Sequence, residues 1–188
     1  GQVAFLQTTH KRVNEHWVPV EHLLLSPPNE PKELVTYLEE VVDALGITTG
    51  IFNFDLIFDG EHFWLIDLGA RIGGNCIPDL IRWQCGLNEY HVLLNQALGQ
   101  PNDFKLHPSG GFFGVHLLGA ERSGSLAGYN EKALVDFQDQ VHAHCFRWKV
   151  GQPVDAFESG GQNGGYIVFK AGHPDALREV ARNIASTK

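Results

Sequence analysis

The chain has no methionine among its 188 residues and only three cysteines, Cys76, Cys85 and Cys145. Three widely spaced cysteines do not form a disulfide framework, so a reducing cytoplasm is the expected compartment. The apolar runs are strand-length and interrupted, which excludes a membrane-spanning helix. Because the chain starts at Gly1, in the middle of a pattern, and has no methionine, we expect it to be part of a longer protein.

Basic residues are also scarce. The chain has 14 Lys and Arg against 22 Asp and Glu, a net charge of −8, and no run of basic residues. Such a surface repels phosphate backbones and anionic lipids, so neither nucleic acid nor a membrane is an expected partner. The chain is 43% hydrophobic and 19% charged, which is enough apolar material for the core of one ordinary domain or two small ones.

Helical and strand-like periods both occur along the chain, which predicts a mixed α+β fold in two small pieces with a boundary in residues 102–110. Asp59-Gly60, between two β-rich runs, is typical of a hairpin. The expected elements are extended segments at 3–7 and 17–25 joined by a polar loop, helices at 31–45, 77–83, 89–98, 134–137 and from 174 onward, and strands at 50–58, 62–68, 111–118, 140–150 and 165–170.

Two carboxylates, Asp55 and Asp67, stand inside the apolar strands of this hairpin, and neither has a basic neighbour in sequence. A carboxylate is costly to bury unless it is paired, hydrogen-bonded or bound to a cation. If the two side chains share a face, they can hold one or two hard divalent cations, which prefer oxygen ligands. The alternative is that both lie at exposed edges or accept backbone hydrogen bonds.

The hairpin connection decides whether the two carboxylates share a face, because side chains alternate between faces along a strand. A two-residue connection would pair Asp67 with Phe52 and point it away from Asp55. A three-residue connection would put Asn53 opposite Asp67 and leave Asp55 diagonal to it, about 7–8 Å away. We expect a connection with an odd number of residues, or a bulge of equal effect.

A glycine-rich turn follows the second strand, in Arg71-Ile72-Gly73-Gly74-Asn75. A planar, always charged guanidinium beside two cation-binding carboxylates suits a phosphate or acyl-phosphate group. The adjoining glycines let backbone amides approach an anion closely. A structural ion pair for Arg71, with the glycines as an ordinary turn, is the open alternative.

The stretch from Ala44 to Gly99, with ALGITTGIFNFDLIF, FWLIDLGARIGGNCIPDLI and ALG, resembles the C-terminal half of an ATP-grasp domain. It is closest to the carboxylate–amine ligases that join amino acids or build dipeptides. The tail, WKVGQPVDAFESGGQNGGYIVFKAGHPDALREVARNIA, is similar to their small C-terminal subdomain. The resemblance implies an α+β chain with the C-terminal lobe of an ATP-grasp domain, an antiparallel sheet with flanking helices, at 1–103. A small C-terminal α+β subdomain is expected at 104–188.

In that family two acidic residues on neighbouring strands hold the magnesium ions of MgATP, and Asp55 and Asp67 match those positions. Arg71 matches an arginine that steadies the transferred phosphoryl group and the acyl-phosphate. Gly74 matches a glycine whose amide contacts the same group, and Asn53 matches a polar position two residues before the first metal ligand. The resemblance therefore implies ATP and Mg²⁺, or Mn²⁺, as cofactors. It implies Arg71 as the catalytic residue, with Gly74 and Asn53 also binding the cofactor.

Two positions depart from the family pattern. Asp67 stands where glutamate is usual, and Gly69 stands where asparagine is commonly a third metal ligand, although the amino-acid-ligase branch tolerates glycine there. The residues before Gly46 also lack a glycine-rich phosphate loop with its lysine. The chain is therefore expected to be inactive alone and to need N-terminal ATP-grasp segments, in cis or as a separate chain.

The implied reaction is MgATP-dependent formation of an amide or peptide bond from a small carboxylate and an amine, through an acyl-phosphate. A homodimer is compatible with the sequence. Two alternatives stay open: a non-catalytic module or subunit that keeps the fold, and an ATP-grasp enzyme of the biotin-carboxylase or purine-pathway type. The sequence does not define the carboxylate and amine substrates, because segments outside it would build most of the acceptor pocket.

Overall fold

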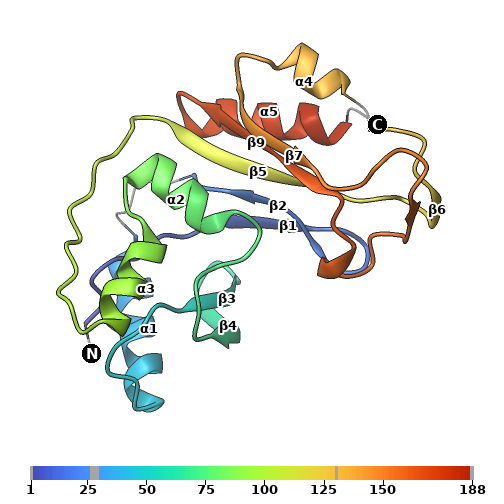
Figure 1. The fold of residues 1–188 in the computed structure, drawn as a ribbon. Coiled ribbons are helices and arrows are strands. Elements are labelled where there is room, and N and C mark those ends of the chain that lie inside the picture. Colours follow the sequence, from blue (N-terminus) through green and yellow to red (C-terminus); the bar gives the residue numbers. More distant parts are fainter. Residues whose placement is uncertain (1, 26–29, 130, 187–188) are drawn as a thin grey trace. The chain divides into compact units, whose positions relative to one another are not determined.

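The computed structural model describes residues 2–25, 30–129 and 131–186 (Figure 1). The chain folds into two compact units. The first unit combines Gly1–Thr8 with Ser26–Ser109, and the second combines Thr9–Leu25 with Gly110–Lys188. The chain therefore passes from one unit to the other three times, and the last passage falls within the expected boundary stretch.

The division at 1–103 and 104–188 differs from these units because Thr9–Leu25 supplies two strands to the sheet of the second unit. The assignment of those two ranges to an ATP-grasp lobe and a C-terminal subdomain stays a prediction.

The second unit is built on a five-stranded sheet in the order β1-β2-β5-β9-β7, in which every neighbouring pair is antiparallel. Helix α5 packs against β5 and β9 (Figure 1). The bounds are β1 (His10–Val13), β2 (Pro19–Leu23), β5 (Phe112–Leu118), β7 (Val141–Phe146), β9 (Gly165–Ala171) and α5 (Pro174–Ser186).

The core of the second unit lies under α5. The apolar residues of this helix recur at helical spacing, and Leu177, Val180, Ala181 and Ile184 are all buried. They form one cluster with Leu23, Ile167 and Phe169 of the sheet. The helix begins at Pro174, whose fixed φ and missing N–H suit a first turn, so the predicted C-terminal helix is confirmed.

One glycine is required for this packing. A Cβ on Gly114 of β5 would lie 2.6 Å from Cδ2 of Leu23 and 2.8 Å from the ring of Phe169. The remaining short elements of this unit are β6 (Gly124–Ser125), α4 (Lys132–Asp136), β8 (Pro153–Val154) and a 3₁₀ turn, η1 (Gly160–Gln162).

Strand β1 was expected to be a polar loop, and this expectation is wrong. Its residues pair with β2, and Arg12 of β1 lies directly opposite Glu21 of β2. On the other edge of β2, His116 of β5 lies opposite the same glutamate. The Glu21 side chain is buried, and its Oε2 lies 3.3 Å from Nη2 of Arg12 and 3.8 Å from Nδ1 of His116. Burial raises the pKa of Glu21, but the neighbouring His116 and Arg12 outweigh it, so the pKa is lowered.

The first unit contains a two-stranded antiparallel sheet and three helices. The bounds are α1 (Lys32–Ala44), β3 (Asn53–Phe58), β4 (Phe63–Gly69), α2 (Ile77–Cys85) and α3 (Glu89–Ala97). Leu34 and Leu38 are the buried residues of α1, and the side chain of Asn88 caps α3 by accepting the N–H of His91.

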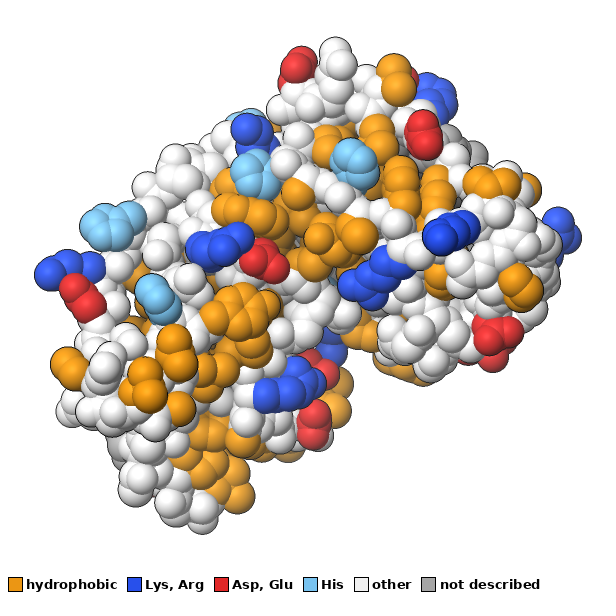
Figure 2. Space-filling view, viewed as in Figure 1, with side chains coloured by type: hydrophobic (Ala, Val, Ile, Leu, Met, Phe, Trp, Pro, Cys, Tyr) orange, Lys and Arg blue, Asp and Glu red, His pale blue; other side chains and the backbone are white. Residues whose placement is uncertain are grey.

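Most of the predicted elements are confirmed within one to three residues at each end. The expected strand at 140–150 is shorter, because β7 ends at Phe146. Segment 3–7 forms no strand, although it was expected to be extended. Within the described residues, no helix combines the length and the apolar composition that crossing a bilayer requires. On the face drawn in Figure 2, the described lysine and arginine side chains are dispersed among acidic and apolar ones.

Candidate active site on the β3–β4 hairpin

The two predicted metal ligands lie directly opposite each other in the ladder of the first unit. Asp55 of β3 pairs with Asp67 of β4. The connection between the strands has four residues, because Phe58 pairs with Phe63. Such a connection alone would place the two carboxylates on opposite faces. The register shifts by one residue between Leu56 and Asp55, and this bulge returns both carboxylates to one face.

The predicted bulge, which brings both carboxylates to one face, is confirmed. The two-residue and three-residue connections are both wrong, because the connection has four residues. A three-residue connection would have placed Asn53 opposite Asp67, but Asn53 pairs with Gly69. Asp55 is therefore directly opposite Asp67 instead of diagonal to it. The extra residue of the bulge is Ile66, whose side chain is 61% exposed, so the bulge costs little apolar burial.

Two like charges at directly opposite positions are unfavourable unless something compensates them. The Cβ atoms of such a pair lie about 4.5–5.5 Å apart. Asp67 is exposed and Asp55 is half-buried, so solvent or a bound cation can reach this face. Among the described residues, no group of three or more His, Cys, Asp and Glu side chains is arranged to hold a metal ion. Any cation here would take its other ligands from water or from a substrate.

Arg71 lies over the same face of the hairpin. A Cβ on Gly69 would be 3.3 Å from Nε and 3.4 Å from Cγ of Arg71, so the arginine side chain covers the position that Gly69 leaves empty. Gly69 pairs with Asn53, two residues beyond the aspartate pair on each strand, and side chains two residues apart share a face. The guanidinium is exposed, and its Nη1 donates to the carbonyl of Ile72 at 3.0 Å.

Asn53 contacts the glycine turn that follows β4. A Cβ on Gly73 would lie 3.2 Å from Oδ1 of Asn53 and 3.0 Å from Cβ of Ile77, so only a glycine fits without a shift. Nothing lies within 4 Å of the corresponding position on Gly74, which leaves its backbone open on that side.

The turn itself is strained. Asn75 and Cys76 have φ values of 54° and 66°, in the left-handed region that β-carbon-bearing residues rarely adopt. The N–H of Ile77 donates to the carbonyl of Gly74 at 2.9 Å, and α2 begins directly after the turn. The first N–H groups of α2 are already used, because Asp79 and Leu80 both donate to the carbonyl of Cys76 and Pro78 has no N–H. The sequence analysis did not assign a positive φ to either residue; asparagine after two glycines is a usable signal for Asn75, whereas Cys76 carries none.

The structure thus gathers all five predicted site residues on one hairpin and the turn that follows it. Asp55, Asp67 and Arg71 share one face, and Asn53 contacts the turn that contains Gly74. The roles of these residues stay predictions. In the sequence analysis Gly69 is only a departure from the family pattern, which commonly has asparagine there. The structure explains the glycine, because the side chain of Arg71 occupies the space beside it.

No protein-family model matches the sequence, and no curated protein matches it. Solved structures do match. The L-amino acid ligase from Bacillus licheniformis matches 90% of this chain with a TM-score of 0.71 and 18% identity, over 43% of its own length. The phosphoribosylglycinamide synthetase from Anaerococcus prevotii matches 95% of this chain with a TM-score of 0.67 and 18% identity, over 47% of its own. The phosphoribosylaminoimidazole carboxylase ATPase subunit from Aquifex aeolicus matches 94% with a TM-score of 0.62 and 12% identity, over 51% of its own.

The chain spans about half the length of these solved structures. They are ATP-grasp ligases, and at identities of 12–18% the likeness concerns the fold. The predicted mixed α+β class is confirmed by the antiparallel sheet and its helices. The chain therefore has the fold of about half of an ATP-grasp ligase.

Proposed function

We propose that the chain supplies the cation- and phosphoryl-binding part of an ATP-dependent ligase that joins a carboxylate to an amine through an acyl-phosphate. The observation that carries this proposal is the ladder register, which sets Asp55 directly opposite Asp67 on the face that Arg71 covers. The likeness of this chain to ATP-grasp ligases supports the proposal, because the chain then has the fold expected of a ligase that uses ATP.

The residues present fit a magnesium–nucleotide complex. Mg²⁺ keeps several waters and is usually held by one or two carboxylates together with substrate phosphates, so a pair of aspartates is a sufficient protein ligand set. The space beside Gly74 leaves room for a phosphate to approach the glycine turn closely, next to the Arg71 guanidinium. MgATP bound here would supply the phosphoryl group that activates the carboxylate substrate.

Each residue has a separate task in this proposal. Asp55 and Asp67 hold the cation, and the positive charge of the cation offsets the negative charge of the two carboxylates on one face. Arg71 holds the transferring group in line with a planar, bidentate fork. Oδ1 of Asn53 lies beside Gly73 and leaves no room there for a β-carbon, so it favours glycine at this position of the turn. The shorter reach of Asp67, compared with the usual glutamate, is offset by its position directly opposite Asp55.

The substrates follow from the proposal only as classes: a small carboxylate and a small amine. Amino acids are the first candidates, since an L-amino acid ligase is among the matching structures. A purine-pathway substrate is the second candidate, because the phosphoribosylglycinamide synthetase matches at the same 18% identity. The N-terminal segments of the ligase, in cis or on a separate chain, would complete the nucleotide site, and a homodimer is compatible with this arrangement.

The test is ADP formation by the complete protein that contains this chain, with amino acids offered in pairs as carboxylate and amine. Arg71→Ala should lower kcat about a hundredfold, about 2.7 kcal/mol, with little change in Tm, because its contact strengthens in the transition state. Arg71→Lys should rescue poorly, since it keeps the charge and loses the fork. Asp55→Asn and Asp67→Asn should each raise the magnesium concentration required.

Asp155→Asn is the matched control, because Asp155 is an exposed aspartate of the second unit. Wild-type turnover in Arg71→Ala, Asp55→Asn and Asp67→Asn would contradict the proposal. Cation binding without ADP formation under any substrate pair would favour the non-catalytic module instead.

A further inference from the structure

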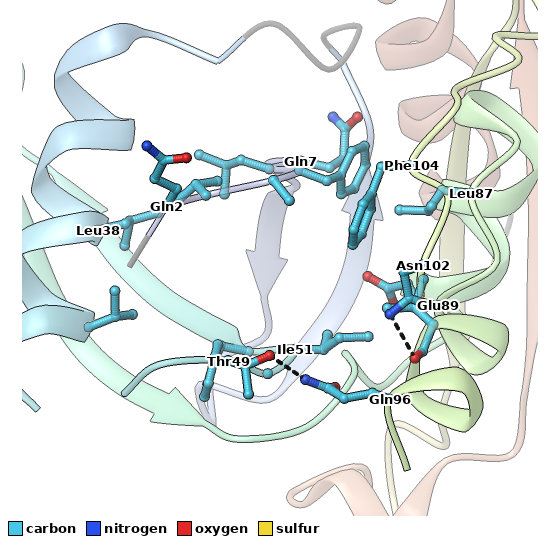
Figure 3. A pocket seen from close by; sticks show the side chains of 18 of the residues that line it. Gln2, Gln7, Leu38, Thr49, Ile51, Leu87, Glu89, Gln96, Asn102 and Phe104 are labelled. Atoms are coloured by element: carbon cyan, nitrogen blue, oxygen red, sulfur yellow. Dashed lines mark hydrogen bonds between the residues drawn. The ribbon is translucent and has the colours of Figure 1, made fainter. Parts of the chain in front are cut away.

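A cavity of about 460 Å³ lies within the first unit, and none of the five site residues lines it. Its walls come from segment 2–7, from α1 and α3, and from the stretch that leads into β3. Figure 3 shows Glu89, Gln96 and Asn102 together on the α3 side, across from Gln2 and Leu38. A volume of this size is within the range of small-molecule sites, about 300–1,000 Å³.

The cavity is on the opposite face of β3 from the carboxylate pair. Phe54 lines it, and neighbouring residues of a strand point to opposite faces, so Asn53 and Asp55 face away from it. A ligand in this cavity would therefore touch the strand that carries Asp55 without reaching the proposed cation.

The wall formed by segment 2–7 is held by specific hydrogen bonds. The N–H of Val3 donates to Oε1 of Glu39 at 3.0 Å, and Sγ of Cys85 donates to Oε1 of Gln7 at 3.3 Å. Burial raises the pKa of Cys85 to about 11, so this thiol keeps its proton and its donor role at neutral pH. Segment 2–7 is thus tied to α1 and α2 and forms one wall of the cavity.

The lining is mostly apolar and contains one titratable side chain, Glu89. Among the described lining residues none is Lys, Arg or His, so the cavity offers no charge partner to a phosphate or a carboxylate. The apolar lining includes Phe5, Leu38, Ile47, Phe52, Phe54 and Val92.

Two hydrogen-bond acceptors at the wall lack donors. Oε2 of Glu89 and Oδ1 of Asn102 are buried and have no hydrogen-bond partner within the described part of the chain, whereas Nδ2 of Asn102 donates to the carbonyl of Val92 at 3.3 Å. Buried acceptors without donors cost free energy and are rare in native structures. On the same side Nε2 of Gln96 is already used, because it donates to Oγ1 of Thr49 at 2.7 Å (Figure 3).

We propose that this cavity binds an apolar amine, with its amino group donating to Glu89 and Asn102 and its hydrophobic body against the aromatic wall. An amino group supplies the hydrogen-bond donors that Oε2 of Glu89 and Oδ1 of Asn102 lack. Its positive charge is attracted by the negative carboxylate of Glu89. Burial raises the pKa of Glu89, and an ammonium group beside the carboxyl would favour the ionised form again. Amine binding at Glu89 does not depend on ligase activity.

The test uses three probes with the same ring and different head groups: 2-phenylethylamine, 2-phenylethanol and 3-phenylpropionate. Each is titrated into the 188-residue chain by calorimetry at neutral pH, and amide NMR shifts locate the site. The amine should bind about tenfold more tightly than the alcohol, because hydrogen bonds to a charged group are stronger, and the carboxylate should bind most weakly. The shifts should fall in α3 and in residues 50–54.

Glu89→Gln should lower the affinity for the amine to that of the alcohol and leave the alcohol unchanged. Glu33→Gln is the matched control, since Glu33 also lies in the first turn of a helix but is exposed and outside the cavity. Equal affinities for the three probes in the wild-type chain, no binding of the amine, or an unchanged head-group preference in Glu89→Gln would each overturn the assignment. The wild-type series decides even if the variant does not fold.

Discussion

Asp59 shows how one side chain sets the geometry of the hairpin. Its Oδ1 accepts the N–H groups of Glu61 and His62 at 2.9 and 2.8 Å, and its Oδ2 accepts Nε1 of Trp64 at 2.8 Å. The backbone N–H of His62, the indole of Trp64 and the N–H of Glu61 lower the pKa of Asp59 to about 2. This side-chain turn favours a four-residue connection over the tight two-residue turn that Asp59-Gly60 suggests.

A pH dependence follows from the lowered pKa of Asp59. Its folded-state pKa of about 2 is below the ordinary 3.8, so its contribution to stability is complete above about pH 4 and is lost as the pH falls towards 2. The difference in Tm between the wild-type chain and Asp59→Ala should therefore be largest above pH 4 and shrink towards pH 2. Thermal unfolding at a series of pH values measures it, with Asp155→Ala as an exposed control. A difference that stays constant over this range would contradict the role of Asp59.

At the scale of elements, the register of β4 against β3 is the feature on which the site depends. Inserting one glycine after Ile66 should move Asp67 one position along the ladder and place it on the face opposite Asp55. Cation binding should then be lost. Deleting Ile66 removes the bulged residue and leaves a regular ladder with Asp67 still opposite Asp55, so this variant should retain cation binding. Paramagnetic broadening of amide NMR signals by Mn²⁺ measures both variants. Equal cation binding by the insertion variant and the deletion variant would show that the register is not required.

The elements illustrate what a sequence can and cannot determine. Helix α5 was predicted because its apolar residues recur at helical spacing and form one buried face. Strands β5 and β9 were predicted from short apolar runs, and three consecutive residues are buried in each. Strand β1, with the sequence HKRV, was not predicted because its stability comes from a cross-strand partner, Glu21, that is distant in the pattern. Tertiary pairing overrides local preference there.

The sequence predicted that the two carboxylates share a face, with a bulge as one of two routes, but it did not predict that Asp55 and Asp67 pair directly. The side chains of Asp55, Asp67 and Arg71 were selected from their chemistry together with the resemblance to ATP-grasp ligases, because type and spacing alone left a structural role open. The bulge depends on side-chain interactions at the turn and on α1, where the hydroxyl of Tyr37 accepts the N–H of Leu65 at 3.1 Å. No local pattern in β4 encodes such a contact from a helix about thirty residues earlier.

At the scale of the whole molecule, the chain is about half the length of the ligases whose fold it shares. The 188 residues include no glycine between Gly1 and Gly46, so no glycine-rich phosphate loop precedes the hairpin within this sequence. We therefore expect the isolated chain not to bind MgATP tightly, because the cation site alone contributes only a few ligands. Calorimetry with MgATP is the measurement, and micromolar affinity of the isolated chain would contradict this expectation.

The central claim is that Asp55 and Asp67 form one cation-binding face, and Mn²⁺ titration of the isolated chain tests it most directly. Amide signals near the hairpin and the turn at 71–76 should broaden first in the wild-type chain. Asp55→Asn and Asp67→Asn should each greatly reduce this selective broadening, whereas Asp155→Asn should leave it unchanged. Broadening that is spread evenly over exposed carboxylates, or that is identical in the wild type and both site variants, would contradict the account.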